Sequence, residues 1–521
     1  MTDDTSINDG PSIKLSGGRL LLLSGFIMLA TIMQTLDMTI ANVALPHIQS
    51  SLSAAQDQIT WMLTSYVVAS AIGMSLTGYL VERFGRMRVF VYSVVGFTIA
   101  SVLCGVSQSL TEIVLFRILQ GAAGASLVPL SQAILMDIYP REKFGPAIAA
   151  WGMGVMVGPI FGPTIGGYLT DTLSWHWVFF INVPIGILCA IGIAALLPES
   201  KRNPKANFDM QGFIYIALAL ASFQLFLDRG ETQDWFSSTE ILIEAVVAVL
   251  MFYLFIAHIF TTKHPFLKPG LFADRNYVAG SFLAFSTGIT LLSVMALLPS
   301  MLQNLIGYPI VETGVLMMPR GIGTMVAMGF AGRLIRRVDP RLMMLAGGSM
   351  VGISLWEMST FNLNVTANQM IITGVIQGFG IGILFTPLSA MAFGTLQAQY
   401  RTDGTAIFSL IRSIGSSVGI SMVSTLLAQQ TQTNHAELAE HITPFSKPVI
   451  DMVGQGVLRL DAPGSLAMLN GEITRQASMI GYIDFFTLMT WVTFLSLPLI
   501  FLMRRPKGQS SAPVELAAVE V

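Results

Sequence analysis

The chain has 521 residues, of which 53% are hydrophobic and only 11% are charged, and its formal net charge is −2. Soluble domains carry about 25% charged residues, so a long chain with half that content keeps most of its surface away from water and is a polytopic membrane protein. The near-neutral charge excludes a polycationic nucleic-acid binder. The two cysteines, Cys104 and Cys189, lie in separate apolar runs and have no metal-ligand spacing.

Apolar runs long enough to cross a bilayer recur along the whole chain. A spanning helix needs about 20 mostly apolar residues, and polar or Gly/Pro-containing breaks separate such runs here. The first nineteen residues lack the pattern of a removable signal peptide, so we expect the first run to be retained. The fourteen predicted spans are Leu20–Leu45, Ile59–Leu80, Val89–Val106, Ile113–Met136, Phe144–Leu169, Val178–Leu197, Met210–Leu227, Ile241–Ile259, Tyr277–Leu298, Gly314–Leu334, Leu342–Phe361, Met370–Phe393, Thr405–Leu427 and Ile483–Met503.

The positions of Lys and Arg predict the orientation, because positive residues are retained on the cytoplasmic side. If the N-terminus is cytoplasmic, 21 of the 28 Lys and Arg residues lie in cytoplasmic segments and four lie outside. The remaining three, Arg117, Arg320 and Arg412, lie within spans. The sequence therefore predicts that both termini are cytoplasmic, which an odd number of spans would not allow.

A repeat indicates two halves separated by an insertion. The run GYLVERFGRMR that begins at Gly78 matches GRLIRRVDPRL at Gly332, and Gln120 before a glycine matches Gln377 before a glycine. The offsets are 254 and 257 residues. Each offset covers eight spans, whereas parallel six-helix halves would give six, so two helices are inserted between the halves.

The predicted organisation follows from this repeat and is all-α, with two six-helix bundles and two additional helices. Its parts are a cytoplasmic tail (1–19), an N-terminal six-helix bundle (20–198), a linker with two inserted helices (199–270), a C-terminal six-helix bundle (271–503) that includes a periplasmic loop (428–481), and a second cytoplasmic tail (504–521).

Six motifs resemble those of the major facilitator superfamily and, within it, the fourteen-helix drug:proton antiporters of the EmrB/QacA type, above all the EmrB-like multidrug efflux pumps. The resemblance covers nearly the whole chain. The motifs are LDMTIANVALP (Leu36 to Pro46), GYLVERFGRMR (Gly78 to Arg88), Arg117 with Gln120 and Gly121, GVMVGPIFGPTIGG (Gly154 to Gly167), WVFFINVPIG (Trp177 to Gly186) and IRSIGSSVG (Ile411 to Gly419).

The resemblance implies the major facilitator fold, drug:proton antiport by alternating access, and a place in the bacterial inner membrane. It implies a gating motif after the second span, at Gly78, Glu82, Arg83, Gly85 and Arg86, where Glu82 replaces the usual aspartate and keeps its charge. It also implies an antiporter motif in the fifth span, at Gly154, Gly158, Pro159, Gly162, Pro163, Gly166 and Gly167. In that motif, close packing and hinge roles overlap.

Asp37 is the one acidic residue well inside a span of the first half. A carboxylate there is costly unless it is protonated, paired or facing water, so it is suited to taking up and releasing protons. At 1.5 Å per residue, Asp37 lies roughly 12 Å and Arg117 roughly 6 Å from the outer ends of their spans. We predict that Asp37 alternates between a proton and Arg117; the alternative is that both residues are structural.

Charged and polar side chains of other spans complete the predicted sites. Arg320 and Glu357 lie at similar predicted depths, where they could pair and contribute to proton coupling, although such a pair is more often structural. Side chains expected to line the substrate cavity are Asp37, Asn42, Tyr66, Gln120, Gln377 and Arg412.

The sequence predicts a transporter with no cofactor and no metal, because it contains no Walker A loop and no hydrolase or zinc-protease motif. The alternatives are a narrow exporter of a metabolite, fatty acid or siderophore in the same fold, an intramembrane enzyme acting on lipid-linked substrates, and a sensor without transport. The long outside segment Ala428–Gly481 contains two stretches with helical spacing, His435–Ile442 and around Ile450–Leu460. By resemblance to EmrB-type pumps, it would bind a periplasmic adaptor that leads to an outer-membrane channel; the alternative is a lid on the transporter itself.

Overall fold

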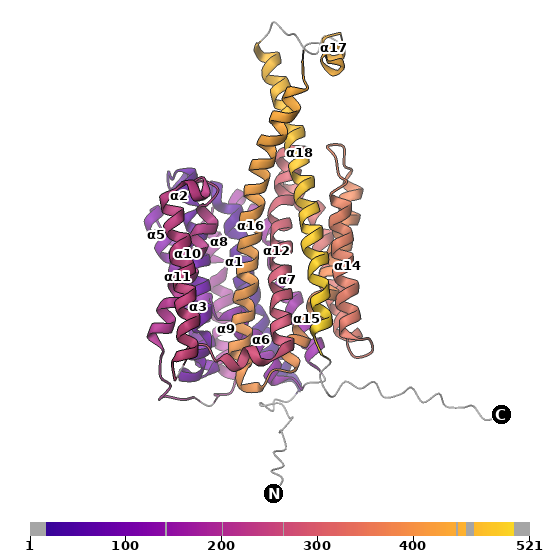
Figure 1. The fold of residues 1–521 in the computed structure, drawn as a ribbon. Coiled ribbons are helices and arrows are strands. Elements are labelled where there is room, and N and C mark those ends of the chain that lie inside the picture. The colour runs from indigo at the N-terminus through magenta and orange to yellow at the C-terminus, as the bar shows by residue number, and fades with distance from the viewer. Residues whose placement is uncertain are drawn as a thin grey trace, which may run out of the picture.

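The structure is a computed structural model that describes residues 17–140, 143–200, 202–263, 265–443, 446–454 and 463–504. Within them it is built from helices that run side by side, and two of the helices project far beyond the rest (Figure 1). The helices of the first half are α1 (Gly17–Ser51), α2 (Gln56–Ile59), α3 (Trp61–Phe84), α4 (Arg86–Val106), α5 (Leu110–Gly124), α6 (Leu127–Ile138), α7 (Phe144–Thr172), α8 (Trp177–Phe180) and α9 (Asn182–Leu196).

The remaining helices follow the same pattern of long apolar segments. Two helices, α10 (Met210–Arg229) and α11 (Thr239–Thr261), come next in the chain. The second half contains α12 (Arg275–Ser300), α13 (Ile310–Leu334), α14 (Pro340–Met358), α15 (Ala367–Gly394), α16 (Arg401–Glu440), α17 (Lys447–Gly454) and α18 (Pro463–Ser496), which ends in the 3-10 turn η6 (Leu497–Leu502).

Thirteen helical segments of the described residues are long and apolar enough to cross a membrane. In this set α5 and α6 count as one segment, Leu110–Ile138, which matches the predicted fourth span. The 19-residue α14 is not in the set, because its ends carry Arg341 and Glu357, but it packs lengthwise against α15 and α18. With α14, the arrangement has the predicted fourteen membrane helices.

Polar caps fix where several of these helices begin. The side chain of Ser109 accepts a hydrogen bond from the Glu112 N–H at the start of α5, and Asp209 does the same for Gly212 at the start of α10. Such caps satisfy backbone donors that the first turn leaves free, so each helix begins at the membrane surface rather than fraying.

The two halves meet along two seams, and the inserted helices cover one of them. Helix α7 packs against α13 on one side of the molecule, and α3 packs against α16 on the other. Helix α10 contacts both α3 and α16, and the Ser421 hydroxyl of α16 donates to the Leu227 carbonyl of α10 at 2.8 Å. The insertion therefore touches both halves.

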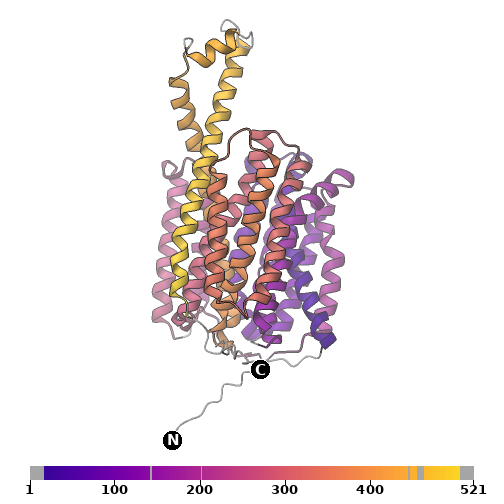
Figure 2. The same cartoon turned by 90° about the vertical axis from the view of Figure 1, so that its right-hand side faces the viewer.

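The outside segment between the last two spans differs from the predicted loop. Helix α16 continues to Glu440 and α18 already begins at Pro463, so both membrane helices extend outward as a hairpin with α17 at its tip (Figures 1 and 2). His435 and Asn470 are hydrogen bonded across the hairpin at 3.0 Å. Most of the stretch predicted at His435–Ile442 is the end of α16, which continues as one helix through the polar run from Gln429 to Asn434. Part of the stretch around Ile450–Leu460 lies outside the described residues.

The predicted topology can be measured with reporter fusions. We expect fusions placed after Pro198 and after Pro506 both to report the cytoplasm, because the Lys and Arg residues are concentrated at that end. A fusion after Asn434, in the projecting hairpin, should report the opposite side. A cytoplasmic signal from Asn434, or an external signal from either proline, would contradict the orientation.

Candidate functional site

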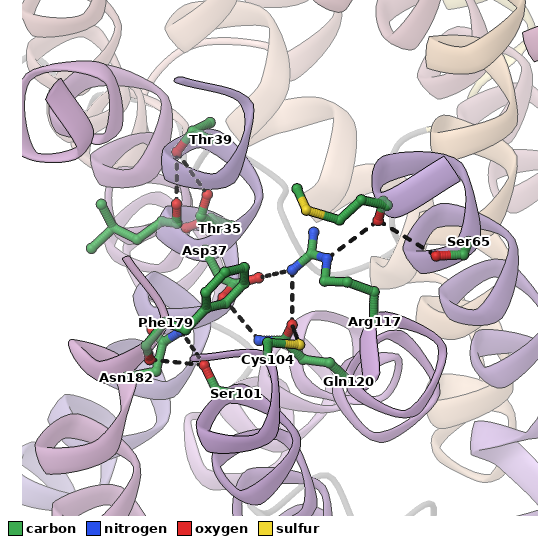
Figure 3. Close-up of polar contacts among 12 residues, drawn as sticks. Thr35, Asp37, Thr39, Ser65, Ser101, Cys104, Arg117, Gln120, Phe179 and Asn182 are labelled. Carbon is green, nitrogen blue, oxygen red and sulfur yellow. Dashed lines mark hydrogen bonds and ion pairs between the residues drawn. The ribbon is translucent and has the colours of Figure 1, made fainter. Parts of the chain in front are cut away.

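Asp37 is fully buried in the middle of α1 and accepts hydrogen bonds from side chains of two other helices (Figure 3). The Nη1 atom of Arg117 on α5 donates to Oδ2 at 2.7 Å. The other carboxylate oxygen, Oδ1, accepts from Gln120 at 2.9 Å and from Asn182 of α9 at 2.7 Å. The predicted pair of Asp37 and Arg117 is therefore present in the structure, inside a larger network.

Arg117 is as deeply buried as its partner, with 1% of its surface exposed. Its Nη1 also donates to Gln120 Oε1 at 2.8 Å, and its Nε donates to the Met62 carbonyl at 3.4 Å. The guanidinium lies over the ring of Tyr66, 4.2 Å from the centroid. Paired, hydrogen bonded and stacked in this way, the cation avoids the large penalty of a lone buried charge.

The arrangement makes the pairing of Arg117 depend on the negative charge of Asp37. Carboxylate and guanidinium attract strongly where water is scarce, so the ionised pair holds α1 and α5 together. A proton on Asp37 would remove the negative charge, turn one acceptor oxygen into a donor, and leave Arg117 without its counter-ion. Protonation of Asp37 and its pairing with Arg117 are thus two alternative ways to satisfy the same buried carboxylate.

Asn182 is a member of this network that the sequence did not single out. Its side chain donates to Asp37 and also to the Ser101 hydroxyl at 3.0 Å, and Ser101 donates in turn to the Phe179 carbonyl at 2.9 Å. The signal was present, because an amide at the first turn of an otherwise apolar span needs a polar partner. What the sequence lacked was the identity of that partner, which lies 145 residues away.

Of the predicted cavity residues, Asp37, Tyr66 and Gln120 lie together around Arg117, whereas the others lie elsewhere. Gln120 bridges Asp37 and Arg117 within the network. Asn42 lies on α1 beyond this network and is exposed. Arg412 of α16 lies over the ring of Phe385 at 5.6 Å. The described residues contain no cluster of three or more His, Cys, Asp or Glu side chains able to hold a metal ion.

Arg320 and Glu357 do not form the predicted pair, and both Nη atoms of Arg320 have no hydrogen-bond partner among the described residues. The reason is depth. Helix α13 begins at Ile310, so Arg320 lies ten residues inside it, or about 15 Å. Glu357 is the residue before the last residue of α14, which ends at Met358. Gln377, the second-half counterpart of Gln120, has an unpaired buried oxygen as well.

A second charged cluster closes the end of the bundles opposite to the hairpin. Asp137, at the end of α6, is paired with Arg86 at the start of α4 and with Arg401 at the start of α16, where the Arg401 distance is 2.9 Å. Asp137 and Arg401 join the two halves, and the sequence analysis singled out neither. Gly85 separates α3 from α4 with φ of +89°, and a Cβ there would lie 3.3 Å from Ser200 Oγ. Gly85 of the gating motif therefore makes a tight turn that disfavours any side chain.

The rest of the gating motif binds the linker and the second half. Glu82 accepts from Lys268 at 3.0 Å, and Asp403 of α16 lies 3.8 Å from the same ammonium. Burial alone would lower the pKa of Lys268, but these carboxylates outweigh it and leave that pKa above its ordinary value. Arg83 donates to two carbonyls of the segment before α10, at 3.1 and 3.2 Å. Gly78 lies where a side chain would collide with the carboxylate of Asp403.

Three glycines of the predicted antiporter motif let α7 lie directly on α1. A Cβ on Gly158 would lie 2.5 Å from backbone of α1, one on Gly162 would collide with the Thr39 side chain, and one on Gly166 would lie 3.2 Å from Ile40. Gly154 has ordinary contacts and Gly167 has none within 4 Å. Pro159 and Pro163 lie inside the same helix. The packing role is therefore present beside Asp37, and the hinge role stays a prediction.

Comparison with known proteins identifies the superfamily and the fold of this chain. The model of the Major Facilitator Superfamily matches residues 27–420. Among similar solved structures, the human organic anion transporter MFSD10 has a TM-score of 0.59 at 14% identity and covers 92% of this chain and 100% of its own. The proton:xylose symporter XylE has a TM-score of 0.58 at 13% identity and covers 91% and 95%. At these identities the likeness concerns the fold alone.

Relatives of higher identity span almost the whole chain. The multidrug export protein EmrB of Haemophilus influenzae is 34% identical over 498 residues, covering 94% of this chain and 97% of that protein. The EmrB of Escherichia coli K12 is 33% identical over 500 residues, covering 95% and 97%. The fatty acid resistance protein FarB of Neisseria gonorrhoeae is 33% identical over 500 residues, covering 96% and 98%. The chain therefore belongs to the major facilitator superfamily and, within it, to the EmrB-like family.

Proposed function

We propose that this protein exports structurally varied, amphipathic toxic compounds from the cytoplasm in exchange for protons. Two EmrB relatives with this degree of identity are multidrug export proteins, which supports export of more than one compound. The observation that carries the coupling mechanism is the buried Asp37 carboxylate, held by Arg117, Gln120 and Asn182. The protein lies in the bacterial inner membrane with both termini in the cytoplasm.

Coupling follows from the competition at Asp37. In the ionised state the carboxylate is bound to Arg117 and the network is closed. A proton that arrives from the outside neutralises Asp37 and loosens the contacts among α1, α5 and α9, and its release on the cytoplasmic side restores them. Because α7 packs on α1 through glycines beside this site, a change at Asp37 reaches the helix that meets the second half at α13.

Alternating access requires a contact between the halves that can open. Asp137 with Arg401 is such a contact at the cytoplasmic end, and Lys268 of the linker bridges Glu82 of the first half and Asp403 of the second. We assign this structure to the state that is closed toward the cytoplasm, in which the gating motif holds the ends of α3, α4 and α16 together. Opening toward the cytoplasm would break the contacts of Asp137 and Arg401.

Fatty acid export is the second candidate. The fatty acid resistance protein FarB matches this chain as fully as the multidrug exporters do. Resistance profiles of cells that express the protein distinguish the two functions. Protection against several unrelated cationic and neutral compounds supports multidrug export, whereas protection confined to long-chain fatty acids supports the narrower function.

The projecting hairpin supports an envelope partner. We propose that the ends of α16 and α18, with α17, bind a periplasmic adaptor that leads to an outer-membrane channel. Two helices that extend this far beyond the membrane are not needed to join two spans. Exposed apolar side chains on the hairpin, such as Ile450, Leu466 and Met468, need a cover that the described part of the chain does not provide.

The coupling mechanism predicts that Asp37→Asn loses proton-driven export. Asn keeps the size and one acceptor oxygen but cannot release a proton, so we expect drug efflux driven by a pH gradient in proteoliposomes to fall about tenfold or more. Substrate binding by the purified variant should persist. Asp484→Asn is the matched control, because Asp484 is an exposed carboxyl of α18. Drug efflux by Asp37→Asn at the wild-type rate would contradict the proposed role of Asp37 in proton coupling.

Substitutions of Arg117 test the other half of the pair. Arg117→Ala leaves a buried carboxylate without its partner, and breaking a buried pair costs about 3–5 kcal/mol, so we expect both lower thermal stability and lost transport. Arg117→Lys keeps the charge but not the planar group, and we expect partial activity. Full activity in Arg117→Ala would contradict competition between Arg117 and the proton.

The gating contact predicts that Gly85→Val lowers transport more than it lowers the amount of protein in the membrane. Valine is strained at a φ of +89° and would shift the start of α4, which carries Arg86. Transport per molecule should be measured against Gly25→Val, because Gly25 has no atom within 4 Å of its Cβ position. If Gly85→Val lowers transport and the amount of protein in the membrane equally, the turn is needed for folding and not for gating.

If the hairpin binds a periplasmic adaptor, replacing Thr433 to Arg475 by a short Gly/Ser linker should separate export across the envelope from drug:proton exchange. We expect loss of export across the whole envelope and of adaptor co-purification, while drug:proton exchange in proteoliposomes survives. Loss of exchange by the isolated protein would instead make the hairpin part of the transporter's own gate.

A further inference from the structure

A small cavity lies inside the second half, among α12, α13, α14, α15 and the end of α18. About 20 Å³ of it is open to the centre of a water molecule, which is room for one small ion or one or two waters. Its polar lining includes Arg320, Gln377 and the hydroxyls of Thr287, Thr290 and Thr493, and the lining residues that the structure describes include no carboxylate. The cavity is separate from Asp37, whose partners all belong to the first half.

Arg320 brings a positive charge to this cavity that no described residue neutralises. The residue is 6% exposed, and neither of its Nη atoms has a hydrogen-bond partner in the described parts of the chain. The buried Oε1 of Gln377 is unpaired too. A buried charge without partner or hydrogen bonds is strongly unfavourable, so an anion in the cavity would remove a large penalty.

The repeat explains which group is missing. Gly158 and Gly162 of α7 pack on Thr35 and Thr39 of α1, whereas Gly415 and Gly419 of α16 pack on Phe285 and Ile289 of α12. The two glycines of α16 follow those of α7 by 257 residues, and the residues that they contact on α12 follow those on α1 by 250. The same offset of 250 carries Asp37 to Thr287, which lines the cavity. A hydroxyl therefore stands where the first half has its carboxylate.

The cation is retained but enters from another helix. Gly121 packs on the Tyr66 carbonyl and Gly378 packs on the Arg320 carbonyl, so Arg320 is the counterpart of Tyr66. The counterpart of Arg117 at the offset of 257 is Gly374, whose Cβ position lies 3.5 Å from Arg320 Cβ. At this equivalent place each half thus has a buried guanidinium near a buried glutamine, Arg117 with Gln120 and Arg320 with Gln377, but the described second half has no carboxylate beside them.

We propose that this cavity binds a single monovalent anion of about the size of chloride, held by the Arg320 guanidinium and occupying the place of the Asp37 carboxylate. One positive charge favours one negative charge, and the cavity volume excludes a drug or a fatty acid. The hydroxyls of Thr290 and Thr493, whose oxygens are 3.4 Å apart, and a turned amide of Gln377 supply further donors. The proposal does not depend on which compounds the protein exports.

The test is thermal unfolding of the purified full-length protein while chloride replaces gluconate at constant ionic strength. Gluconate is too large for the cavity. We expect the Tm to rise saturably with chloride by roughly 2–4 °C, because a ligand that binds only the folded state stabilises it. Bromide should act like chloride. An unchanged Tm across the series in the wild-type protein would overturn the proposal.

Three variants separate a site from a general salt effect. Arg320→Gln should lose the chloride dependence, whereas Arg412→Gln, which removes another cation of the same half that stacks on Phe385, should keep it. Gln377→Glu supplies a carboxylate beside Arg320, so this variant should be insensitive to chloride and should stay folded without it. If Arg320→Gln does not fold, Gln377→Glu alone provides the test. A Tm of Gln377→Glu that rises with chloride as much as the wild-type Tm overturns the proposal.

Discussion

A charge inside a bilayer must be paired, and this constraint shapes the whole first half of the molecule. Asp37 is bound by side chains from α5 and α9, and α7 approaches α1 closely enough that glycines are required beside it. In the proposed mechanism, the same arrangement that makes the carboxylate tolerable also makes it a switch, because one proton removes the charge that holds the contacts. In this mechanism, stability and coupling therefore both draw on the same ion pair.

Much of the fold could be predicted from composition and periodicity, because a spanning helix is recognisable from its own residues. The pair of Asp37 and Arg117 was predictable for the same reason, since depth along a helix follows from residue number. The predicted pair of Arg320 and Glu357 was wrong because the depth of Arg320 was counted from the wrong end residue. Helix α13 begins four residues before the predicted span, which places Arg320 deeper. Element boundaries are the least secure part of such reasoning.

Contacts between distant segments could not be predicted. Asp137 and Arg401 are 264 residues apart, and each lies at the end of a helix, where a charge alone indicates only the membrane surface. Asn182 likewise needs the position of α9 against α1 before its partner is known. The predicted loop is a helical hairpin instead, because the polar run from Gln429 to Asn434 ends the apolar span but contains no glycine or proline that would end the helix.

The unbroken course of α16 has a mechanical consequence. This helix carries Arg401, which is bound to Asp137 at its inner end, and runs for 40 residues without an internal proline to the hairpin that His435 joins to α18. At 1.5 Å per residue it is a rod about 60 Å long, so a tilt of about 10° around the inner end displaces its far end by about 10 Å. Breaking the ion pair of Arg401 and Asp137 would thus displace the tip of the hairpin, so a protein bound there would move when the proposed gate opens.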